Sequence, residues 1–181
     1  GSTDKTIKVW NLDDGRCTRT LLGHKSDVTC LVKLNERQIA SGSVDKTIKV
    51  WNLDHGNCSK TLEGHADEVN DRQIASGYDY IIKVWDLDHG ICMKILQEQD
   101  CIVSCLIKVN NNQIASGHWD YDIKLWNLDN ESCIKTLKGN NNEVDCLVKL
   151  NEKQIASGSK DRTIKVWDLE NGKCTRIFQL Q

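Results

Sequence analysis

Residues Gln38–Cys58 read QIASGSVDKTIKVWNLDHGNC, and edited copies of this stretch recur along the 181-residue chain. The pentapeptide QIASG begins at Gln38, Gln73, Gln113 and Gln154. The motif IK(V/L)W ends at Trp10, Trp51, Trp85, Trp126 and Trp167, in steps of 41, 34, 41 and 41 residues. Self-similarity at a period of about 40–45 residues indicates stacked supersecondary units. A repeat architecture is therefore expected.

The second repeat predicts four strands, at residues 27–34, 37–43, 47–51 and 58–62. Apolar and polar residues alternate in the first of them, DVTCLVKL, which is the period of a strand. Gly56 lies in the last turn, where a tight hairpin requires positive φ. No segment has a sustained helical period, and the chain contains no proline. We expect an all-β chain of four-stranded antiparallel sheets that are apolar on both faces and stack radially.

Composition narrows the function classes. The net charge of −2 and the pI near 6.2 give no support to nucleic-acid binding. No apolar run approaches the roughly 18 residues that span a bilayer, so we expect no membrane association. No phosphate-binding loop or metal-binding quartet is present, so we expect neither a cofactor nor a metal.

The nine cysteines follow the repeat. One repeat position holds Cys17, Cys58, Cys92, Cys133 and Cys174, and a second holds Cys30, Cys105 and Cys146. Such cysteines are most simply buried small hydrophobes. Cys101 is out of register and makes a lone CxxxC with Cys105, for which packing is favoured over a metal or redox role. The odd total argues against a disulfide framework and predicts a cytoplasmic protein.

These motifs together resemble the WD-repeat (tryptophan-aspartate repeat) β-propeller family: Gly-His, an alternating strand, an SGSxD turn, then IKVW followed by Asp or Asn. The resemblance covers essentially the whole chain. It implies a small or partial propeller of about four and a half repeats in a single domain. The expected ranges are a half-blade at 1–22 and blades at about 23–63, 64–97, 98–138 and 139–181.

The resemblance also implies a structural hydrogen-bond network in each blade, made by His, Ser, Asp and Trp. The matching residues are His24, Ser41, Asp45 and Trp51; His65, Ser76, Asp79 and Trp85; Ser116, Asp120 and Trp126; and Ser157, Asp161 and Trp167. Gln99 and Asn140 stand where the last two sets would have histidine. Because these sets recur once per blade, they are read as scaffold and not as catalytic triads.

The chain departs from its own repeat in two places. The first unit contains only the last two strands, and the third is seven residues short, within Gly64–Gly77 and just before Asp79. Blade three then either lacks its innermost strand or borrows one from another segment. An open sheet edge invites pairing with another chain, so self-association through the half-blade and blade three is one expectation. A truncated or decayed repeat array is the alternative.

Aromatic residues flank the turn aspartate in units three and four only. They are Tyr78, Tyr80, Trp119 and Tyr121, with His118 adjacent, where units two and five have Val44, Lys46, Lys160 and Arg162. Exposed Tyr and Trp are typical of interaction hot spots; packing against a neighbouring blade is the other interpretation. The leading hypothesis is a non-catalytic scaffold that binds a protein or peptide through these five residues. The alternative is a structural fragment whose open edges drive assembly into a larger propeller.

Overall fold

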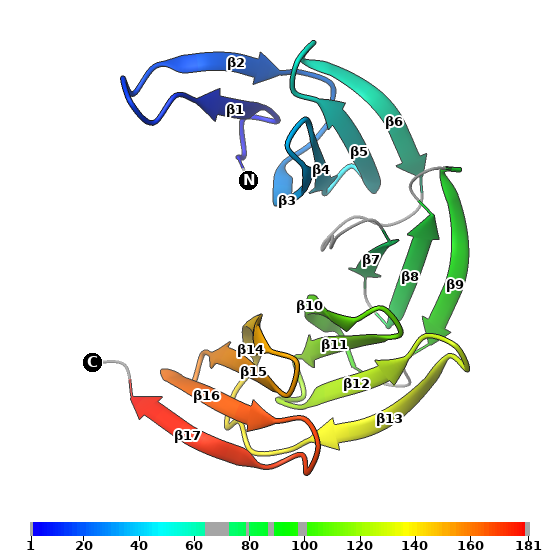
Figure 1. Ribbon diagram of the computed structural model, residues 1–181, viewed down its shortest axis with the longest axis vertical. Helices are drawn as coiled ribbons and strands as arrows, with labels where there is room; N and C mark the ends of the chain where they lie inside the picture. Colours follow the sequence, from blue (N-terminus) through cyan, green and yellow to red (C-terminus); the bar gives the residue numbers. More distant parts are fainter. Residues whose placement is uncertain (1, 64–72, 79, 87–88, 98–100, 180–181) are drawn as a thin grey trace. The chain divides into compact units, whose positions relative to one another are not determined.

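The computed structural model describes residues 2–63, 73–78, 80–86, 89–97 and 101–179, with residues 73–78 described by their backbone alone. Every regular element in these ranges is a β-strand (Figure 1). The strands form five antiparallel sheets of two, four, three, four and four strands. No helix in the described ranges is long and apolar enough to cross a membrane. The predicted all-β class is confirmed.

Consecutive strands are hydrogen-bonded neighbours in every sheet. The first two sheets are made of β1 (Ile7–Trp10) and β2 (Cys17–Leu21), then β3 (Val28–Asn35), β4 (Gln38–Ser43), β5 (Thr47–Asn52) and β6 (Asn57–Glu63). The third contains β7 (Gln73–Tyr78), β8 (Ile81–Asp86) and β9 (Ile91–Gln97). The last two are made of β10 (Val103–Asn110), β11 (Gln113–His118), β12 (Ile123–Asn127) and β13 (Ser132–Leu137), then β14 (Val144–Asn151), β15 (Gln154–Ser159), β16 (Thr163–Asp168) and β17 (Cys174–Gln179).

Tight hairpins explain this meander order. Gly56, in the turn between β5 and β6, has φ of 70°, as the sequence predicts for that position. The turn between β4 and β5 places Lys46 at φ 66°, and Tyr121 and Arg162 take φ of 77° and 64° at the equivalent place. The turns thus share one backbone shape, whatever residue occupies them.

The chain divides into two compact units. The first comprises Gly1–Ser76 and Trp85–Cys92, and the second comprises Gly77–Val84 and Met93–Gln181. Two of the hydrophobic clusters lie in the first unit and one lies in the second. Each unit is described separately below.

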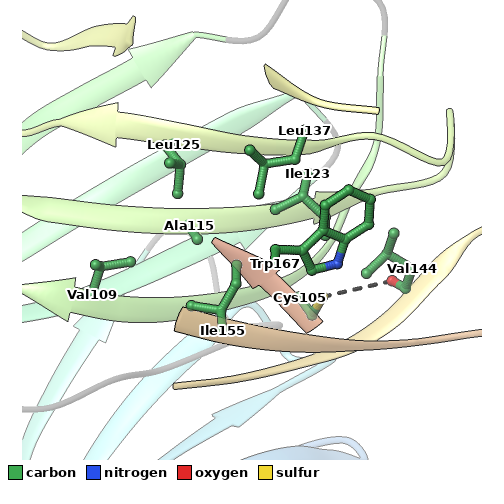
Figure 2. Packing of buried hydrophobic residues seen from close by; sticks show 9 residues of the cluster. All are labelled: Cys105, Val109, Ala115, Ile123, Leu125, Leu137, Val144, Ile155 and Trp167. Atoms are coloured by element: carbon green, nitrogen blue, oxygen red, sulfur yellow. Dashed lines mark hydrogen bonds between the residues drawn. The ribbon is translucent and has the colours of Figure 1, made fainter. Parts of the chain in front are cut away.

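Three of the repeat tryptophans pack against the sheet that precedes them in sequence. Trp51 joins Ile7 and Leu21 of the two-stranded sheet, and Trp85 joins Ile48 and Leu62 of the second sheet. In the second unit, Trp167 packs with Ile123, Leu137 and their neighbours, as Figure 2 shows. Because each sheet has two apolar faces, the large indole of the next repeat covers what would otherwise be exposed.

Trp10 is the exception to this rule. It occupies the same repeat position as Trp51 but is 54% exposed, whereas Trp51 is 1% exposed. The first sheet has only β1 and β2, and no described sheet precedes it. Trp10 is a member of none of the hydrophobic clusters described above.

The expectation that the repeat cysteines are uniformly buried is wrong. All nine are free thiols, and Cys17, Cys92, Cys133 and Cys146 are exposed. In four sheets the first of the two cysteine positions lies opposite the tryptophan, where the strand register shifts. There the thiol donates to the backbone carbonyl two residues later, as Cys58 does to Lys60 at 3.1 Å. The repeat thus uses the thiol as a polar group at a β-bulge as well as for packing.

The short third repeat yields a sheet with three described strands, in the order β7–β8–β9. Most of the shortening expected from sequence falls on residues 64–72, which lie outside the described residues. His65 and Asp79, predicted members of the third network, also lie outside them. The side chains of Ser76 and Tyr78 are likewise not described.

Candidate functional site

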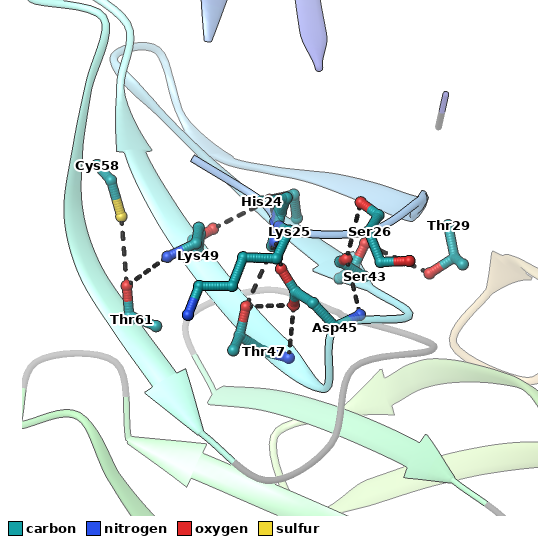
Figure 3. Close-up of polar contacts among 12 residues, drawn as sticks. His24, Lys25, Ser26, Thr29, Ser43, Asp45, Thr47, Lys49, Cys58 and Thr61 are labelled. Carbon is teal, nitrogen blue, oxygen red and sulfur yellow. Dashed lines mark hydrogen bonds and ion pairs between the residues drawn. The ribbon is translucent and has the colours of Figure 1, made fainter. Parts of the chain in front are cut away.

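The second sheet contains a hydrogen-bond network of His24, Ser41, Asp45 and Trp51, and Figure 3 shows the polar contacts around His24 and Asp45. His24 joins two partners: its Nδ1 lies 2.9 Å from Asp45 Oδ2, and its Nε2 lies 2.7 Å from Ser41 Oγ. The indole N–H of Trp51 donates to the same Ser41 oxygen at 2.7 Å. All the buried polar groups in the set are thus satisfied, and these bonds hold the turn after β4 against the segment between β2 and β3 that contains His24.

Asp45 is held ionised by its neighbours. Burial alone would raise the pKa of its carboxyl, but hydrogen bonds from Thr47, the Lys25 backbone N–H and His24 outweigh burial and lower the pKa below its usual range. The Thr47 hydroxyl donates at 2.6 Å and the Lys25 N–H at 2.7 Å. The network therefore depends on the carboxylate form.

We expect Asp45→Asn to lower the free energy of unfolding at neutral pH. On acidification, the free energy of unfolding of the variant should fall less than that of the parent. A carboxyl whose folded pKa is depressed contributes stability above its unfolded pKa of about 3.9, and that stability is lost as the pH falls through the folded value. Urea unfolding of both proteins from neutral pH down to about pH 3 measures this. The gap between their unfolding free energies should narrow with acidification. A gap that stays constant with pH would contradict the role of the charge.

The fifth sheet forms an equivalent hydrogen-bond network in which Asn140 takes the place of the histidine. Asn140 Oδ1 accepts from Ser157 Oγ at 3.4 Å, and the Trp167 indole donates to Ser157 at 2.9 Å. The Lys165 ammonium, 3% exposed, donates to Asp161 Oδ2 at 2.7 Å. A lysine in a strand of this repeat would be expected to be solvated, but Lys165 is buried. The presence of Asn140 in the histidine position could have predicted this, because a buried aspartate without its histidine partner needs another cation nearby.

The fourth sheet departs further. His118 was expected in an exposed binding surface, but it is 0% exposed, so that assignment is wrong. Its Nε2 lies 2.6 Å from Ser116 Oγ, which also accepts the Trp126 indole N–H at 2.8 Å. His118 thus makes the serine contact that His24 makes in the second sheet, from a position two residues after the serine. Gln99, which stands in the histidine position, is outside the described residues.

Three of the predicted binding residues are exposed aromatics of the second unit, here called the aromatic group. They are Tyr80, Trp119 and Tyr121, at 47%, 51% and 44% exposure. Tyr80 directly precedes β8, and the other two lie in the turn between β11 and β12. Solvent exposure argues against the interpretation that these side chains simply fill gaps between blades.

The turn that carries Trp119 and Tyr121 is well braced. The Trp119 N–H donates to the Ile102 carbonyl at 3.1 Å, and the Tyr121 N–H donates to the His118 carbonyl at 3.3 Å. The Tyr121 carbonyl accepts from the Asn140 side-chain amide at 3.2 Å. Exposed rings on a braced backbone lose little conformational freedom when a partner binds.

The first unit has a different surface feature, a pocket of about 520 Å³ beside the His24 network. Its charged lining residues are Lys25, Lys46, Lys49, Asp45 and Glu63. Asp45 already accepts hydrogen bonds from the network, and Lys49 Nζ donates to Thr61 Oγ1 at 2.9 Å. Because lysines outnumber carboxylates, this pocket is chemically suited to an acidic group.

Comparison with known proteins gives the family. The family model described as "WD domain, G-beta repeat" matches residues 15–52, 56–86, 90–127 and 131–168. An uncharacterized WD repeat-containing protein of Schizosaccharomyces pombe is 53% identical over 36 residues, which is 20% of this chain and 10% of that protein. The F-box/WD repeat-containing protein A-like protein of Dictyostelium discoideum is 45% identical over 40 residues, 22% of this chain and 3% of that protein.

Cell division control protein 4 of Saccharomyces cerevisiae is 52% identical over 31 residues, 17% of this chain and 4% of that protein. The chain therefore spans only a small part of the curated relatives it matches. Each family-model match takes the last strand of one sheet and the strands of the next up to its tryptophan. The family-model matches cover most of the chain, and the chain belongs to the WD-repeat family.

Proposed function

We propose that this chain is a non-catalytic scaffold that binds a protein or peptide through Tyr80, Trp119 and Tyr121. WD repeats generally mediate protein–protein interaction. The observation that carries the proposal is the half-exposure of three large aromatic side chains at turns where other repeats have Val, Lys or Arg. Rigid, amphipathic Tyr and Trp side chains supply much of the binding energy in protein interfaces. Their partner is an extended peptide or loop with apolar side chains.

The replacement of Trp119 and Tyr121 by Lys and Arg tests this proposal. These are the residues at 160 and 162 of the fifth repeat, so the same turn accommodates them. A binding peptide is first selected from a displayed library on the unaltered chain, and its affinity is then measured by calorimetry. We expect W119K/Y121R to weaken binding at least about 30-fold, the effect of losing a hot spot of about 2 kcal/mol.

The matched control places Lys and Arg at Val44 and Lys46 of the second repeat. V44K/K46R should bind the peptide within about twofold of the unaltered chain, because energetic coupling between substitutions and a binding site is confined to residues in contact or in one network. Both variants should retain the original melting temperature. Equal affinity of W119K/Y121R and the unaltered chain would reject the aromatic group as the binding site.

A second candidate function rests on Trp10. The two-stranded sheet exposes Trp10, and Leu12 and Leu22 near it in sequence are 95% and 70% exposed. A shallow pocket of about 300 Å³ lined by Ile7, Trp10 and Leu31, among others, adjoins it. We propose that strands of another copy of this chain cover this face, so that the chain self-associates into a larger propeller.

Light scattering after size exclusion tests self-association across a range of concentrations. The unaltered chain should increase in mass with concentration, whereas Trp10→Glu should remain monomeric because a charge on this face opposes burial. Since Trp10 is exposed, the variant should fold as well as the parent. A parent chain that stays monomeric at every concentration would exclude this candidate and leave the peptide-binding proposal unaffected.

A further inference from the structure

The fourth sheet brings a thiol, an imidazole and a carboxylate together. The ligand atoms of Cys101, His118 and Asp120 all lie within 4.8 Å of one another. Cys101 directly precedes the segment leading into β10, His118 ends β11, and Asp120 lies in the following turn. Cys101 is 5% exposed and His118 is 0% exposed, whereas Asp120 is exposed to solvent. The group therefore has two buried ligands and one at the surface, through which an ion can enter.

The other sheets show that this grouping is a departure from the repeat. Backbone hydrogen bonds align the three turns: Trp119 N donates to the Ile102 carbonyl as Val44 N does to Asp27 and Lys160 N to Glu143. Cys101 thereby corresponds to Ser26 and Asn142, and His118 corresponds to Ser43 and Ser159.

In the second and fifth sheets these positions make a simple hydrogen bond. Ser43 Oγ donates to the Ser26 carbonyl at 3.2 Å, and Ser159 Oγ donates to the Asn142 carbonyl at 3.0 Å. In the fourth sheet both positions have changed, and both have become strong ligands of transition metals. One substitution alone would leave no such set.

A third change adds negative charge. Asp122 stands where the second and fifth sheets have Thr47 and Thr163, whose hydroxyls donate to the turn aspartate. The Asp122 backbone N–H donates to Asp120 Oδ1 at 3.2 Å, so this turn has two acidic residues where the other two have one. Lys138 Nζ lies 3.7 Å from Asp122 and offsets part of this charge. A cation at Asp120 would relieve the remaining repulsion.

The histidine is oriented for ligation. The contact between His118 Nε2 and Ser116 Oγ, at 2.6 Å, directs Nδ1 as the ring nitrogen for a metal ion. In metal sites the second ring nitrogen usually donates to an oxygen in this way and fixes the tautomer. The Cys101 sulfur is likewise positioned, because it accepts the Asp120 backbone N–H at 3.1 Å.

We propose that Cys101, His118 and Asp120 bind one divalent transition-metal ion of the zinc type, with water as the fourth ligand. Mixed sulfur, nitrogen and oxygen ligands suit this class of ion, and carboxylate-rich magnesium or calcium sites differ from it. Cysteine binds such an ion as the thiolate, so the Cys101 thiol must lose its proton when the ion binds. Uptake of the ion therefore releases a proton and is weakened by acid.

Cobalt(II) is the probe for this proposal, because its thiolate complexes absorb in the near ultraviolet and its tetrahedral complexes absorb strongly in the visible. We expect the chelator-treated full chain to bind one equivalent of Co²⁺ with both features, and Zn²⁺ to displace it. Cys101→Ser, which installs the residue found at position 26, should lose the charge-transfer band and bind Co²⁺ more than about 10-fold more weakly. Asp120→Asn should keep the band with reduced affinity.

Two further variants complete the test. Cys146→Ser removes an exposed thiol from the fifth sheet and should leave cobalt binding unchanged. The triple variant Q99H/C101S/H118S restores the residues of the second repeat, so it should fold normally and show no rise in melting temperature with Zn²⁺, unlike the parent. No cobalt–thiolate band in the parent, or the same band in C101S, would overturn the proposal.

Discussion

Replacing Trp51 with alanine is expected to lower the free energy of unfolding by about 4 kcal/mol, within the usual range of about 3–5 kcal/mol for a buried aromatic residue. Trp51 is 1% exposed, lies edge-on to the His24 ring at 5.9 Å and packs with Ile7, Leu21 and Val28. Its removal leaves a cavity and takes away the indole donor to Ser41. Urea unfolding monitored by circular dichroism measures the loss.

Trp10→Ala is the matched control for Trp51→Ala. The two residues occupy the same repeat position, but Trp10 is 54% exposed, so its truncation should cost less than about 1 kcal/mol. The ratio of the two losses isolates the effect of packing against the preceding sheet. Equal losses for the two variants would contradict the packing described for the repeat tryptophans.

The second large effect is expected at Gly117. A Cβ at this position would lie 2.5 Å from Cys105 Sγ and 2.7 Å from Val144 Cγ1. Cys105 and Val144 are both buried in the cluster of Figure 2, so neither can move without opening the core. Gly117→Ala should therefore destabilise the chain by about 2–3 kcal/mol. Thermal and urea unfolding of the variant measure this loss.

Gly158 is the equivalent glycine of the fifth repeat. Its Cβ would meet only the Cys146 sulfur, at 2.7 Å, and Cys146 is exposed and can rotate away. Gly158→Ala should therefore cost less than about 1 kcal/mol. A larger loss of unfolding free energy for Gly158→Ala than for Gly117→Ala would contradict the packing described around Gly117.

The sequence predicts the fold well because the alternating pattern of the strands and the turn residues recur in each repeat. Alternation in residues 27–34 and the glycine at position 56 each predict one element, and the tryptophan steps predict how many sheets there are. Propensity, turn residues and periodicity all favour the same structure. Burial within the repeat is harder to predict, since Trp10 and Trp51 carry the same motif but differ in what lies beside them.

The candidate site is harder to predict, because the burial of each side chain depends on which residues surround it in the fold. His118 reads as part of an aromatic run, yet the backbone turns its ring inward to Ser116. Lys165 reads as a solvated strand lysine, yet Asp161 draws it into a buried ion pair. Cys101 reads as half of a CxxxC pair, yet its sulfur lies near His118 and Asp120. The partners of His118 and Lys165 are two and four residues away, and those of Cys101 lie at the end of β11 and in the turn that follows it. In all three cases burial decides the contact, and the local sequence pattern does not show which side chains are buried.

Amide hydrogen exchange with and without a selected binding peptide tests the central proposal most directly. We expect protection at Tyr80 and at residues 119–122, with no change in the equivalent turns at residues 44–46 and 160–162. This result would place the partner on the aromatic group. Protection confined to the β1–β2 sheet, or to the turns at residues 44–46 and 160–162, would contradict the proposed binding surface.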